Sequence, residues 1–383
     1  MGSISKELVK TILEKNAYHS NQLIDNSYNC VFYFRIITKK DVYKKVNLIV
    51  FVNDMQLVIT GYRLFWNGEL DYFIIRCENE VFYNGVLYYF ELEKKDGTLE
   101  YLGKNDLTTE EWKIESFEYK PKETPIKIEL KDTEIDTVYL LMDTYKTTDL
   151  SILQEIDIKN LLFEKENLKE IDGFCCKTSE GLKELFSTVK NKAKTFIIDK
   201  DFEKTCLDFF ISKNIDASQL VETLGENLFS LPVNSSYFNF RYLEFNSGIE
   251  SNFIPEYKLV IALQFIFIGI PLLPFSKIKS LPRDILSHLK NLIEIRKANP
   301  VLKNGEIRFV FANKDVFGFE RFSNGEKLLI FFNRSDESFV MDVTKYFGNG
   351  DFIDISKEHP LKRKRQYSLY PKDFVILKKT RER

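Results

Sequence analysis

Length and charge narrow the class of this protein before any motif is considered. The chain has 383 residues, enough for two or three domains that each bury their own core. Its 55 Lys and Arg residues nearly balance its 57 Asp and Glu residues, so no overall field favours nucleic acid or an anionic membrane surface. Five cysteines without zinc-type spacing, and a start without an apolar run, predict a cytoplasmic protein with no signal peptide.

Residues 1–125 are predicted to form an N-terminal β-sandwich that a short helix precedes. Short runs such as "CVFYFRIIT", "VNLIVFV" and "DYFIIRC" alternate apolar and polar positions between turn residues. Such spacing is typical of an antiparallel sandwich. The aromatic content of 14% suits β-rich cores.

Residues 126–303 change to strands that alternate with helices. We expect strands in "DTVYLLMDTY", "DGFCCKT", "KTFIIDKDF" and "YFNFRYLEF", and helices in "IKNLLFEKENLKEI", "SEGLKELFSTVKNKA", "DASQLVETLGENLF" and "LPRDILSHLKNLIEIRKANP". Alternation of this kind predicts a parallel sheet covered by helices.

The most apolar run of the chain is "LVIALQFIFIGIPLLPF", Leu259 to Phe275. Gln264, Gly269 and Pro271 interrupt it, and a membrane-spanning helix needs about 20 apolar residues with anchoring flanks. We therefore expect a buried helix that ends at Gly269 and a short buried strand after it.

Residues 304–383 are predicted to form a C-terminal β-sandwich. Asn324-Gly325 gives a hairpin signal inside "FERFSNGEKLLIFF". The last segment, "LKRKRQYSLYPKDFVILKK", is expected to form a pair of strands.

Three segments, in their order along the chain, resemble the amylase superfamily, glycoside hydrolase family 13. "ALQFIFIGIPLLPF" is similar to that family's passage from the seventh barrel helix to the eighth strand, and the text around Asn333–Asp336 to its C-terminal β-domain. "ELDYFIIRCENEVFYNGVLYYFELEKKDG" resembles the N-terminal sandwich of neopullulanases, cyclomaltodextrinases and maltogenic amylases. The fold class that this resemblance implies is α/β plus all-β: a truncated, degenerate TIM-type (β/α) barrel between two β-sandwiches.

The family resemblance implies an Asp nucleophile after the fourth barrel strand, a Glu acid/base after the fifth and a further Asp after the seventh. A retaining glycosidase needs its two carboxyl groups about 5–5.5 Å apart, one ionised and one protonated. Eight βα units need about 250 residues, whereas Lys131 to Asn304 provides 174. The barrel is therefore expected to lack two or three units.

Two alignments to the family pattern stay open. In one, "DGFCCKT" is the fourth strand, which puts Lys177 at the nucleophile, and Asp199-Lys200 replaces the Gly-Glu of the fifth; in the other, these texts are strands two and three. Ser247 and Gly248 take the place of the His-Asp after strand seven in both. Neither alignment retains a catalytic carboxylate pair, so no catalytic residue is predicted.

Other chemical uses of these residues are weaker hypotheses. Lys177 and Lys200 could form a new catalytic pair, and Cys175-Cys176 could form a reactive thiol site. A carboxylate pair could also be rebuilt from four acids near the strand ends: Asp199, Asp201, Glu244 and Glu250. A solvated lysine and a packed cysteine are the simpler explanations. The three histidines, His19, His288 and His359, all fall outside the predicted strand ends.

Three aromatic residues of the N-terminal sandwich are candidate sugar-binding residues. Trp66, Tyr72 and Tyr89 could stack on glucose rings, although core or dimer contacts are an equal explanation. No metal site is predicted, because no Asp/Asn cluster has ligand spacing; calcium is implied only by the resemblance.

The sequence leads to three functional hypotheses. The first is a non-catalytic amylase-family homologue, a pseudoenzyme, that binds α-glucan, such as maltodextrin, or a protein partner without hydrolysis. The second is a glycosidase or transglycosidase that acts on α-1,4-glucans through a rebuilt site. The third is an interaction protein without a sugar function, a homodimer through the N-terminal domain, because this domain often packs across a dimer in the subfamily.

Overall fold

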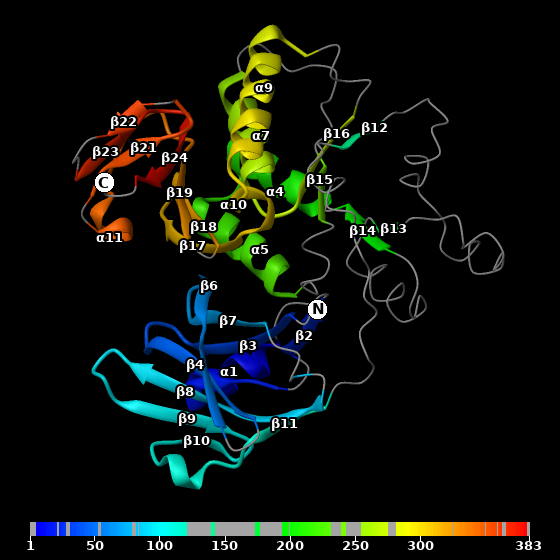
Figure 1. The fold of residues 1–383 in the computed structure, drawn as a ribbon. Coiled ribbons are helices and arrows are strands. Elements are labelled where there is room, and N and C mark those ends of the chain that lie inside the picture. The colour runs from blue at the N-terminus through cyan, green and yellow to red at the C-terminus, as the bar shows by residue number, and fades with distance from the viewer. Residues whose placement is uncertain are drawn as a thin grey trace, which may run out of the picture. The chain divides into compact units, whose positions relative to one another are not determined.

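The computed structural model describes most of the two ends of the chain and parts of its middle (Figure 1). The described residues are 5–20, 23–27, 31–52, 55–78, 82, 84–120, 139–141, 173–176, 194–198, 200–230, 239–242, 254–274, 281–323, 325–348, 350–357, 359–361 and 365–380. The predicted helices in "IKNLLFEKENLKEI" and "SEGLKELFSTVKNKA" lie outside these residues. The chain divides into two compact units, Met1–Glu129 with Gly225–Asn234, and Leu130–Leu224 with Ser235–Arg383.

The N-terminal unit is a sandwich of two antiparallel sheets after one helix, as predicted. Helix α1, Lys6–Lys15, begins at Ser5, whose hydroxyl accepts a hydrogen bond from the Leu8 amide at 3.2 Å. The first sheet has the order β1-β3-β7-β6, with β2 also paired to β3, and the second has the order β10-β9-β8-β4-β5, with β11 paired to β8. The strand bounds are β1 Ala17–Tyr18, β2 Ile24–Ser27, β3 Val31–Lys39, β4 Tyr43–Val52, β5 Met55–Thr60, β6 Tyr62–Trp66, β7 Leu70–Glu78, β8 Val86–Lys94, β9 Leu99–Gly103, β10 Asp106–Thr108 and β11 Phe117–Tyr119.

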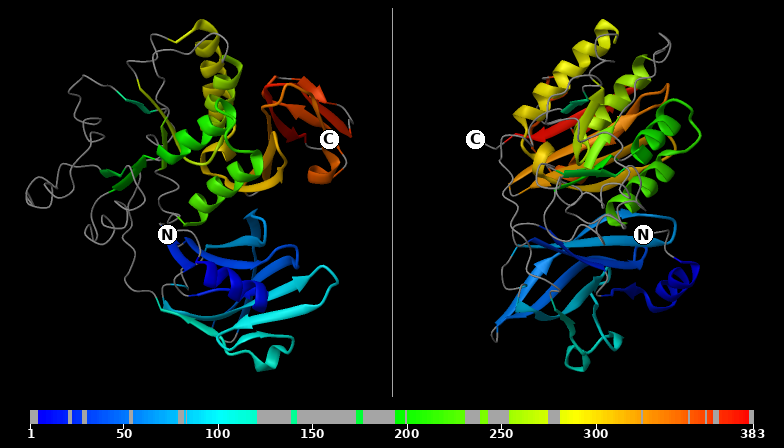
Figure 2. Two further views of the ribbon diagram at one scale, coloured as in Figure 1. Left: turned by 180° about the vertical axis from the view of Figure 1, so that it is seen from behind. Right: turned by 90° about the vertical axis from the view of Figure 1, so that its right-hand side faces the viewer.

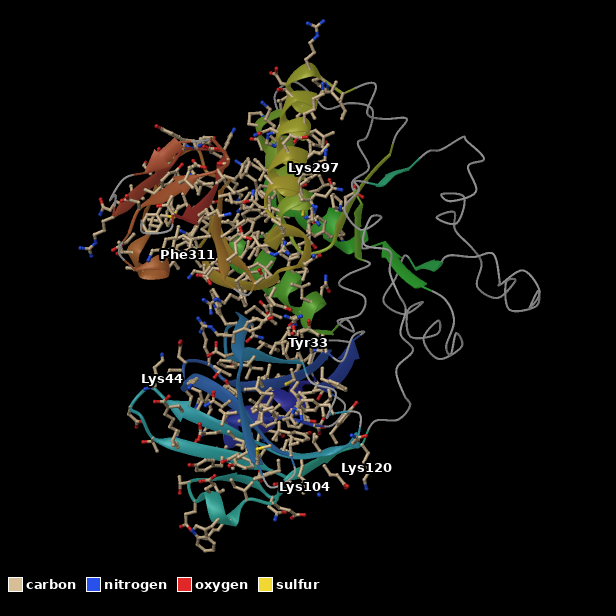
Figure 3. All side chains as sticks on the ribbon, in the orientation of Figure 1. Tyr33, Lys44, Lys104, Lys120, Lys297 and Phe311 are labelled. Atoms are coloured by element: carbon tan, nitrogen blue, oxygen red, sulfur yellow. The ribbon has the colours of Figure 1, made fainter. Side chains whose placement is uncertain are left out.

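Alternate residues of these strands form the sandwich core. Phe32, Phe34 and Ile36 of β3 face Leu48 and Val50 of β4 in one apolar cluster. Such a period of two is what the sequence runs predicted. Tyr33, labelled in Figure 3, alternates with these core residues along β3 and is also buried.

Helix α5 is formed by Ala217–Ser230, and its last residues, from Gly225 on, belong to the N-terminal unit. They cover the second face of the first sheet. The ring of Phe229 lies edge-on to Tyr72, with centroids 5.1 Å apart, and Gly225 lies against Phe65. A Cβ atom on Gly225 would lie 2.3 Å from the Phe65 ring, so only glycine allows this close approach.

The second unit contains a parallel sheet of short strands, as the alternating pattern predicted. Its order is β12-β16-β15-β14-β13, and every neighbouring pair is parallel. The strand bounds are β12 Tyr139–Leu141, β13 Gly173–Cys176, β14 Lys194–Ile198, β15 Asn239–Tyr242 and β16 Ile270–Pro274. The first strand therefore pairs with the last, while the other four follow each other in chain order.

Helices α4, α7 and α9 accompany this sheet. Their bounds are Lys200–Phe210, Ile254–Ile266 and Arg283–Ala298, and the short helix α10, Val301–Asn304, follows. Helix α4 was not predicted as a separate helix. Helix α7 packs against α9 and α4 (Figure 2). Its last eight residues are all buried.

The apolar run of the sequence forms α7 and β16 as predicted, with Gly269 between them at φ +113°. That backbone angle favours glycine, because a side chain would clash there. Among the described residues, no helix is long and apolar enough to cross a membrane.

The C-terminal strands form a six-stranded antiparallel sheet, β17-β18-β19-β24-β21-β22, and a two-stranded one, β20-β23. Their bounds are β17 Glu306–Ala312, β18 Val316–Ser323, β19 Glu326–Asn333, β20 Phe339–Asp342, β21 Phe352–Asp354, β22 His359–Leu361, β23 Gln366–Leu369 and β24 Asp373–Lys379; helix α11, Thr344–Phe347, follows β20. The predicted hairpin joins β18 to β19, with Gly325 at φ +84°.

The prediction that the last two strands pair with each other was wrong. Strand β23 pairs with β20, and β24 inserts between β19 and β21. The apolar residues Val375 and Leu377 of β24 are fully buried, so this strand is stable only inside the large sheet, which the local sequence does not reveal.

Candidate functional site

The carboxyl ends of the parallel strands form the edge at which the family resemblance would place an active site. Cys176, Ile198, Tyr242 and Pro274 end strands β13, β14, β15 and β16. Because neighbouring strands are parallel, all these ends lie on one edge of the sheet. Cys176 is level with Ile197, and Tyr242 is level with Leu272, so neighbouring ends are in close register.

The residues predicted to replace the catalytic groups follow these strand ends in the sequence. Lys177, Ser247 and Gly248 lie outside the described residues. Lys200 is the first residue of α4, two positions after the end of β14. Its backbone is thus at the expected edge, and whether these residues replace a catalytic pair stays a prediction.

The strand order bears on the two alignments that the sequence left open. Strand β14 pairs directly with β15, and β15 with β16. If β16 is the last strand of a barrel, counting back along the sheet puts β14 in the sixth position and β13 in the fifth. This count differs from both alignments, in which β14 was the fifth or the third strand.

The gap between β12 and β13 limits how many further strands the sheet has room for. Leu141 and Gly173 enclose 31 residues. One strand-helix-strand unit takes roughly 30 residues or more, so this gap has room for about one additional strand and its helix. An eight-stranded barrel needs three strands there if β13 is fifth.

The buried carboxylates of the described residues all have structural partners. Glu320 receives an ion pair from Lys327 at 3.1 Å and one from Arg308, and Asp71 pairs with Arg63 at 3.1 Å. Glu100 pairs with Lys94, Glu256 with Lys372, and Asp354 accepts the hydroxyl of Tyr367. Each of these carboxylates lies outside the described part of the parallel sheet, and none forms a pair of acids suited to glycoside hydrolysis.

Two of the three histidines also form hydrogen bonds within the protein. His19 is buried between the sheets, where its Nδ1 donates to the Arg35 carbonyl at 2.6 Å and its Nε2 accepts from the Tyr88 hydroxyl at 3.0 Å. Burial lowers the pKa of His19 to about 4, so the ring is neutral. His288 on α9 donates to the Lys258 carbonyl at 2.9 Å, and burial lowers its pKa as well. Both histidines therefore have structural roles, His19 within the sandwich and His288 between helices α9 and α7.

Of the three candidate sugar-binding residues, Tyr72 lies deepest. Its ring stacks on Phe65 with centroids 4.1 Å apart, and its side chain is 1% exposed. Its hydroxyl accepts a hydrogen bond from Asn67 at 3.0 Å. Tyr72 therefore has its ring faces occupied by protein.

Tyr89 and Trp66 occur on different sheets. Tyr89 of β8 is 3% exposed, donates its hydroxyl to Glu111 at 2.6 Å and accepts from Gln56. Burial and then the hydrogen bond to Glu111 raise the pKa of Tyr89. Trp66 ends β6 and is half-buried, with the Arg63 guanidinium 4.9 Å from its ring centre. Trp66 is the most accessible of the three, and their sugar-binding role stays a prediction.

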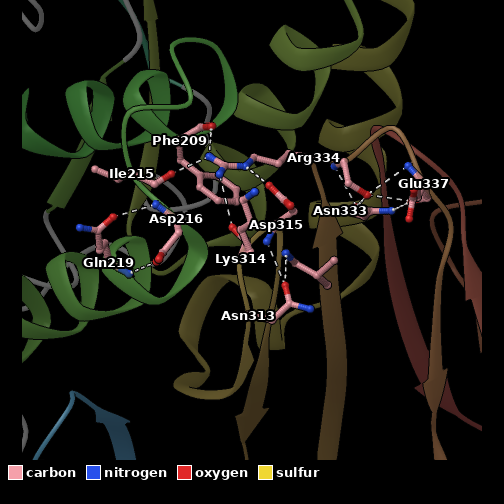
Figure 4. Close-up of polar contacts among 12 residues, drawn as sticks. Phe209, Ile215, Asp216, Gln219, Asn313, Lys314, Asp315, Asn333, Arg334 and Glu337 are labelled. Carbon is pink, nitrogen blue, oxygen red and sulfur yellow. Dashed lines mark hydrogen bonds and ion pairs between the residues drawn. The ribbon is translucent and has the colours of Figure 1, made fainter.

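The sequence interpretation missed the role of Arg334, which belongs to the Asn333–Asp336 text. This buried side chain donates to the carbonyls of Phe209 at 2.5 Å and Ile215 at 2.6 Å, where α4 ends and leads to α5 (Figure 4). Its Nε donates to Asp315 at 2.9 Å, and its guanidinium lies 4.1 Å from the centre of the Phe209 ring. Arg334 thus joins the sheet of β18 and β19 to the helices that follow β14.

Two further arginines, Arg296 and Arg321, bind the end of α7. Arg296 donates to the carbonyls of Phe265 and Gly269, both at 2.7 Å, and Arg321 donates to the Ile266 carbonyl at 2.7 Å. Burial, and then the positive charge of Arg296, lower the pKa of Arg321 to about 9, which leaves it protonated at neutral pH. Cations are favourable at this end of a helix dipole. The two arginines therefore position the start of β16.

No cluster of metal-binding side chains occurs within the described ranges. An N-terminal sandwich followed by a parallel sheet is the architecture that the sequence resemblance implied. The comparisons with known proteins test that resemblance directly.

One curated relative and two solved structures show what the chain is similar to, although no family model matches it. The chain is 26% identical to a cyclomaltodextrinase of Thermoanaerobacter pseudethanolicus over 211 residues, which are 48% of this chain and 36% of that protein. The structure of a cyclomaltodextrinase superposes with a TM-score of 0.68 and 13% identity, over 96% of this chain and all of that one. A type III pullulan hydrolase from Thermococcus kodakarensis superposes with a TM-score of 0.62 and 11% identity, over 95% and 100%.

The chain therefore has the fold of the amylase-type glycoside hydrolases. More narrowly, they confirm the resemblance to the neopullulanase-type subfamily of glycoside hydrolase family 13. The match to the curated cyclomaltodextrinase spans about a third of that protein's length.

Proposed function

We propose that this protein is a non-catalytic relative of cyclomaltodextrinase that binds an α-glucan, such as a maltodextrin, without hydrolysing it. The parallel sheet carries the proposal, because its first strand pairs with its last and only 31 residues lie between β12 and β13. That length is too short for the three strands of an eight-stranded barrel that would separate a first strand from a fifth. By this count β13 takes the fifth position, and we infer that strands two to four, of which the fourth positions the nucleophile in the family, are not all present.

The chemistry of the strand-end residues supports the same proposal. Retaining hydrolysis needs one ionised and one protonated carboxyl group at fixed positions. In the alignment with "DGFCCKT" as the fourth strand, Lys177 and Lys200 replace catalytic groups; the count along the sheet instead puts Lys177 after the fifth strand and Lys200 after the sixth. Ser247 and Gly248 replace the His-Asp after the seventh strand in either case. A lysine ammonium lacks the acceptor oxygens of a carboxylate, and glycine has no side chain to hold a sugar ring.

Binding and hydrolysis are tested separately on the pure chain of 383 residues. Isothermal titration with maltoheptaose and with β-cyclodextrin measures binding, and reducing-sugar release from the same ligands measures hydrolysis. We expect heat of binding with either ligand and no release. Absence of heat with both would overturn the glucan-binding proposal. Release that a single carboxylate substitution abolishes would replace it by the alternative, a glycosidase with a rebuilt site.

Trp66 is the side chain that we expect to contribute to glucan binding. Its half-buried indole leaves apolar surface accessible beside Arg63 and Asp41, which are the kinds of polar groups that bind sugar hydroxyls. Loss of one aromatic contact costs about 1 kcal/mol, so Trp66→Ala is expected to raise the dissociation constant roughly fivefold. Trp112→Ala is the matched control, because Trp112 is the second tryptophan of the chain and lies in the short 3-10 helix Glu111–Lys113 at 80% exposure.

A further inference from the structure

Lys372 joins the start of helix α7 to the C-terminal sheet. Its ammonium pairs with Glu256, in the first turn of α7, at 2.8 Å and with Asp336 at 3.2 Å. Asp336 follows strand β19 and Lys372 precedes β24, and these two strands are paired where Asn333 lies opposite Asp373. Both residues therefore belong to connections at one end of the sheet. Hydrogen bonds to Glu256 and then to Asp336 raise the pKa of Lys372, so the ammonium stays charged at neutral pH.

The segment Asn333–Asp336, part of the text that resembles the family's C-terminal β-domain, fixes the turn that carries Lys372. The Ser335 carbonyl accepts a hydrogen bond from the Lys372 amide at 3.1 Å. The buried side chain of Asn333 donates to the Tyr370 carbonyl at 3.0 Å. Lys372 is therefore attached to the end of β19 through its backbone, while its side chain reaches α7.

The contact between Lys372 and Glu256 also carries two local costs. The backbone of Lys372 lies in the left-handed region at φ +50°, which is unfavourable for a residue with a Cβ atom. Glu256 is 4% exposed, and among the described residues no donor binds its second carboxylate oxygen, Oε2. A buried acceptor without a donor has lost its hydration without a replacement. Opening of the first turn of α7 would return this oxygen to water, so the closed contact depends on the ion pair with Lys372.

We propose that the ion pairs of Lys372 are a latch, which holds the first turn of α7 against the C-terminal sheet and can release that turn while the rest of the helix stays folded. The other end of α7 is held separately, because Arg296 and Arg321 bind its last carbonyls. Local opening of one part of a helix needs only the contacts of that part to break. The two ends of α7 can therefore open independently.

The latch bears on the carboxyl ends of the parallel strands through the chain that enters α7. Strand β15 ends at Tyr242 and α7 begins at Ile254, so 11 residues connect them, and these include Ser247 and Gly248. Release of the first turn adds its residues to this connection. The latch consists of side chains of this protein alone, so it is independent of the proposed glucan binding.

Hydrogen exchange at single-amide resolution on the chain of 383 residues tests the latch. The amides of residues 258–261 report the first turn of α7, because in an α-helix each amide donates to the carbonyl four residues earlier. Lys372→Met keeps a long side chain but removes the charge, which leaves the buried Glu256 without its partner. We expect residues 258–261 to exchange roughly a hundredfold faster in this variant. The Phe267 amide, which donates to the Leu263 carbonyl at 2.9 Å, reports the other end of the helix and should be unchanged.

Lys357→Met is the matched control. The side chain of Lys357 is as exposed as that of Lys372, at 31% against 30%, and its described ion pair is with Asp373, the residue after Lys372. Its substitution should leave the exchange of residues 258–261 unchanged. Lys372→Arg retains the positive charge and is expected to restore slow exchange. Asp336→Asn removes a partner that is 73% exposed, so its effect should be about twofold.

Thermal unfolding shows whether each variant is folded. Lys372→Gln is measured in parallel, because its neutral amide can still donate to Glu256; it should raise the exchange rate about tenfold and carries the test if Lys372→Met does not fold. Three results would overturn the latch: unchanged exchange of residues 258–261 in both neutral variants of Lys372, an equal rise at Phe267, or the same rise in Lys357→Met.

Discussion

The N-terminal sandwich and the C-terminal part of the chain bury their polar groups in different ways. In the sandwich, the core is dominated by aromatic and aliphatic side chains, with His19 neutral among Tyr88, Phe90 and Phe117. In the second unit, buried arginines bind the carbonyls at the ends of helices. The first arrangement depends mainly on packing, and the second on hydrogen bonds that fix helices to a sheet.

This difference suggests which part of an amylase-type framework needs specific polar residues. A sandwich closes its core with any well-packed apolar set, so many sequences suffice. Two loops, from α7 to β16 and from α4 to α5, lie against a sheet. Their backbone carbonyl groups need hydrogen-bond donors. Arg321, Arg296 and Arg334 supply them.

The largest expected effect is the loss of Arg321. Arg321→Met leaves buried carbonyls of Ile266 and Gly305 without their donor, and each unsatisfied group costs about 1–3 kcal/mol. We expect the free energy of opening of α7 and β18 to fall by about 4 kcal/mol, measured by hydrogen exchange of their amides. Arg283→Met, the same substitution at an exposed position of α9, is the control and should change little. Equal effects of the two would show that the buried carbonyl bonds contribute nothing.

An intermediate effect is expected from the protonation of His19. The pKa of His19 is lowered from 6.5 to about 4 in the folded chain, so the unfolded chain binds a proton first as the pH falls. Stability should therefore be retained above pH 6.5 and fall by about 3 kcal/mol as the pH drops to about 4. Denaturation followed by tryptophan fluorescence reports this unit, since both tryptophans lie in it.

His19→Gln isolates this effect from other titrations. The amide retains one donor and one acceptor but carries no charge at any pH. The difference in stability between wild type and His19→Gln should change with pH only below 6.5, the ordinary histidine pKa. A difference that is constant across that range would contradict the buried, neutral state of His19.

The smallest effect concerns the packing of α5 on the first sheet. Alanine normally stabilises a helix interior by about 1 kcal/mol relative to glycine. At Gly225 the added Cβ would lie 2.3 Å from Phe65, and overpacking costs about 1–3 kcal/mol, so we expect Gly225→Ala to destabilise by about 1 kcal/mol. The control is Gly68→Ala, where a Cβ meets nothing within 4 Å. Thermal unfolding followed by tryptophan fluorescence compares them, and a stabilised Gly225→Ala would contradict the close packing.

Much of the fold could be predicted because the strands and helices carry their own periodicity. The run from Leu259 to Phe275 predicted α7 and β16, and Gly269 marks the turn with its positive φ. The hairpin at Gly325 was equally local. The pairing of β23 with β20 was not predicted, since the two strands are separated by other elements and nothing in either names its partner.

The candidate site, like the fold, could be predicted only where it depends on local sequence. Short sequence motifs predict that Lys177, Lys200, Ser247 and Gly248 replace family residues, because such motifs can be compared position by position. They did not reveal that the buried faces of Tyr72 lie against Phe65 and Phe229, because Phe229 is 157 positions further along the chain. Exposure depends on which distant segment covers a side chain.

The sequence by itself determined the order of sandwich, βα region and sandwich, and the family that this order resembles. Hydrophobic periodicity and turn residues are properties of neighbouring positions, so they can be read without a structure. Only the tertiary structure decided that β12 pairs with β16, that Arg321 binds the end of α7, and that Lys372 pairs with Glu256. These features depend on contacts between distant segments, where packing and hydrogen-bond satisfaction are settled by the whole fold.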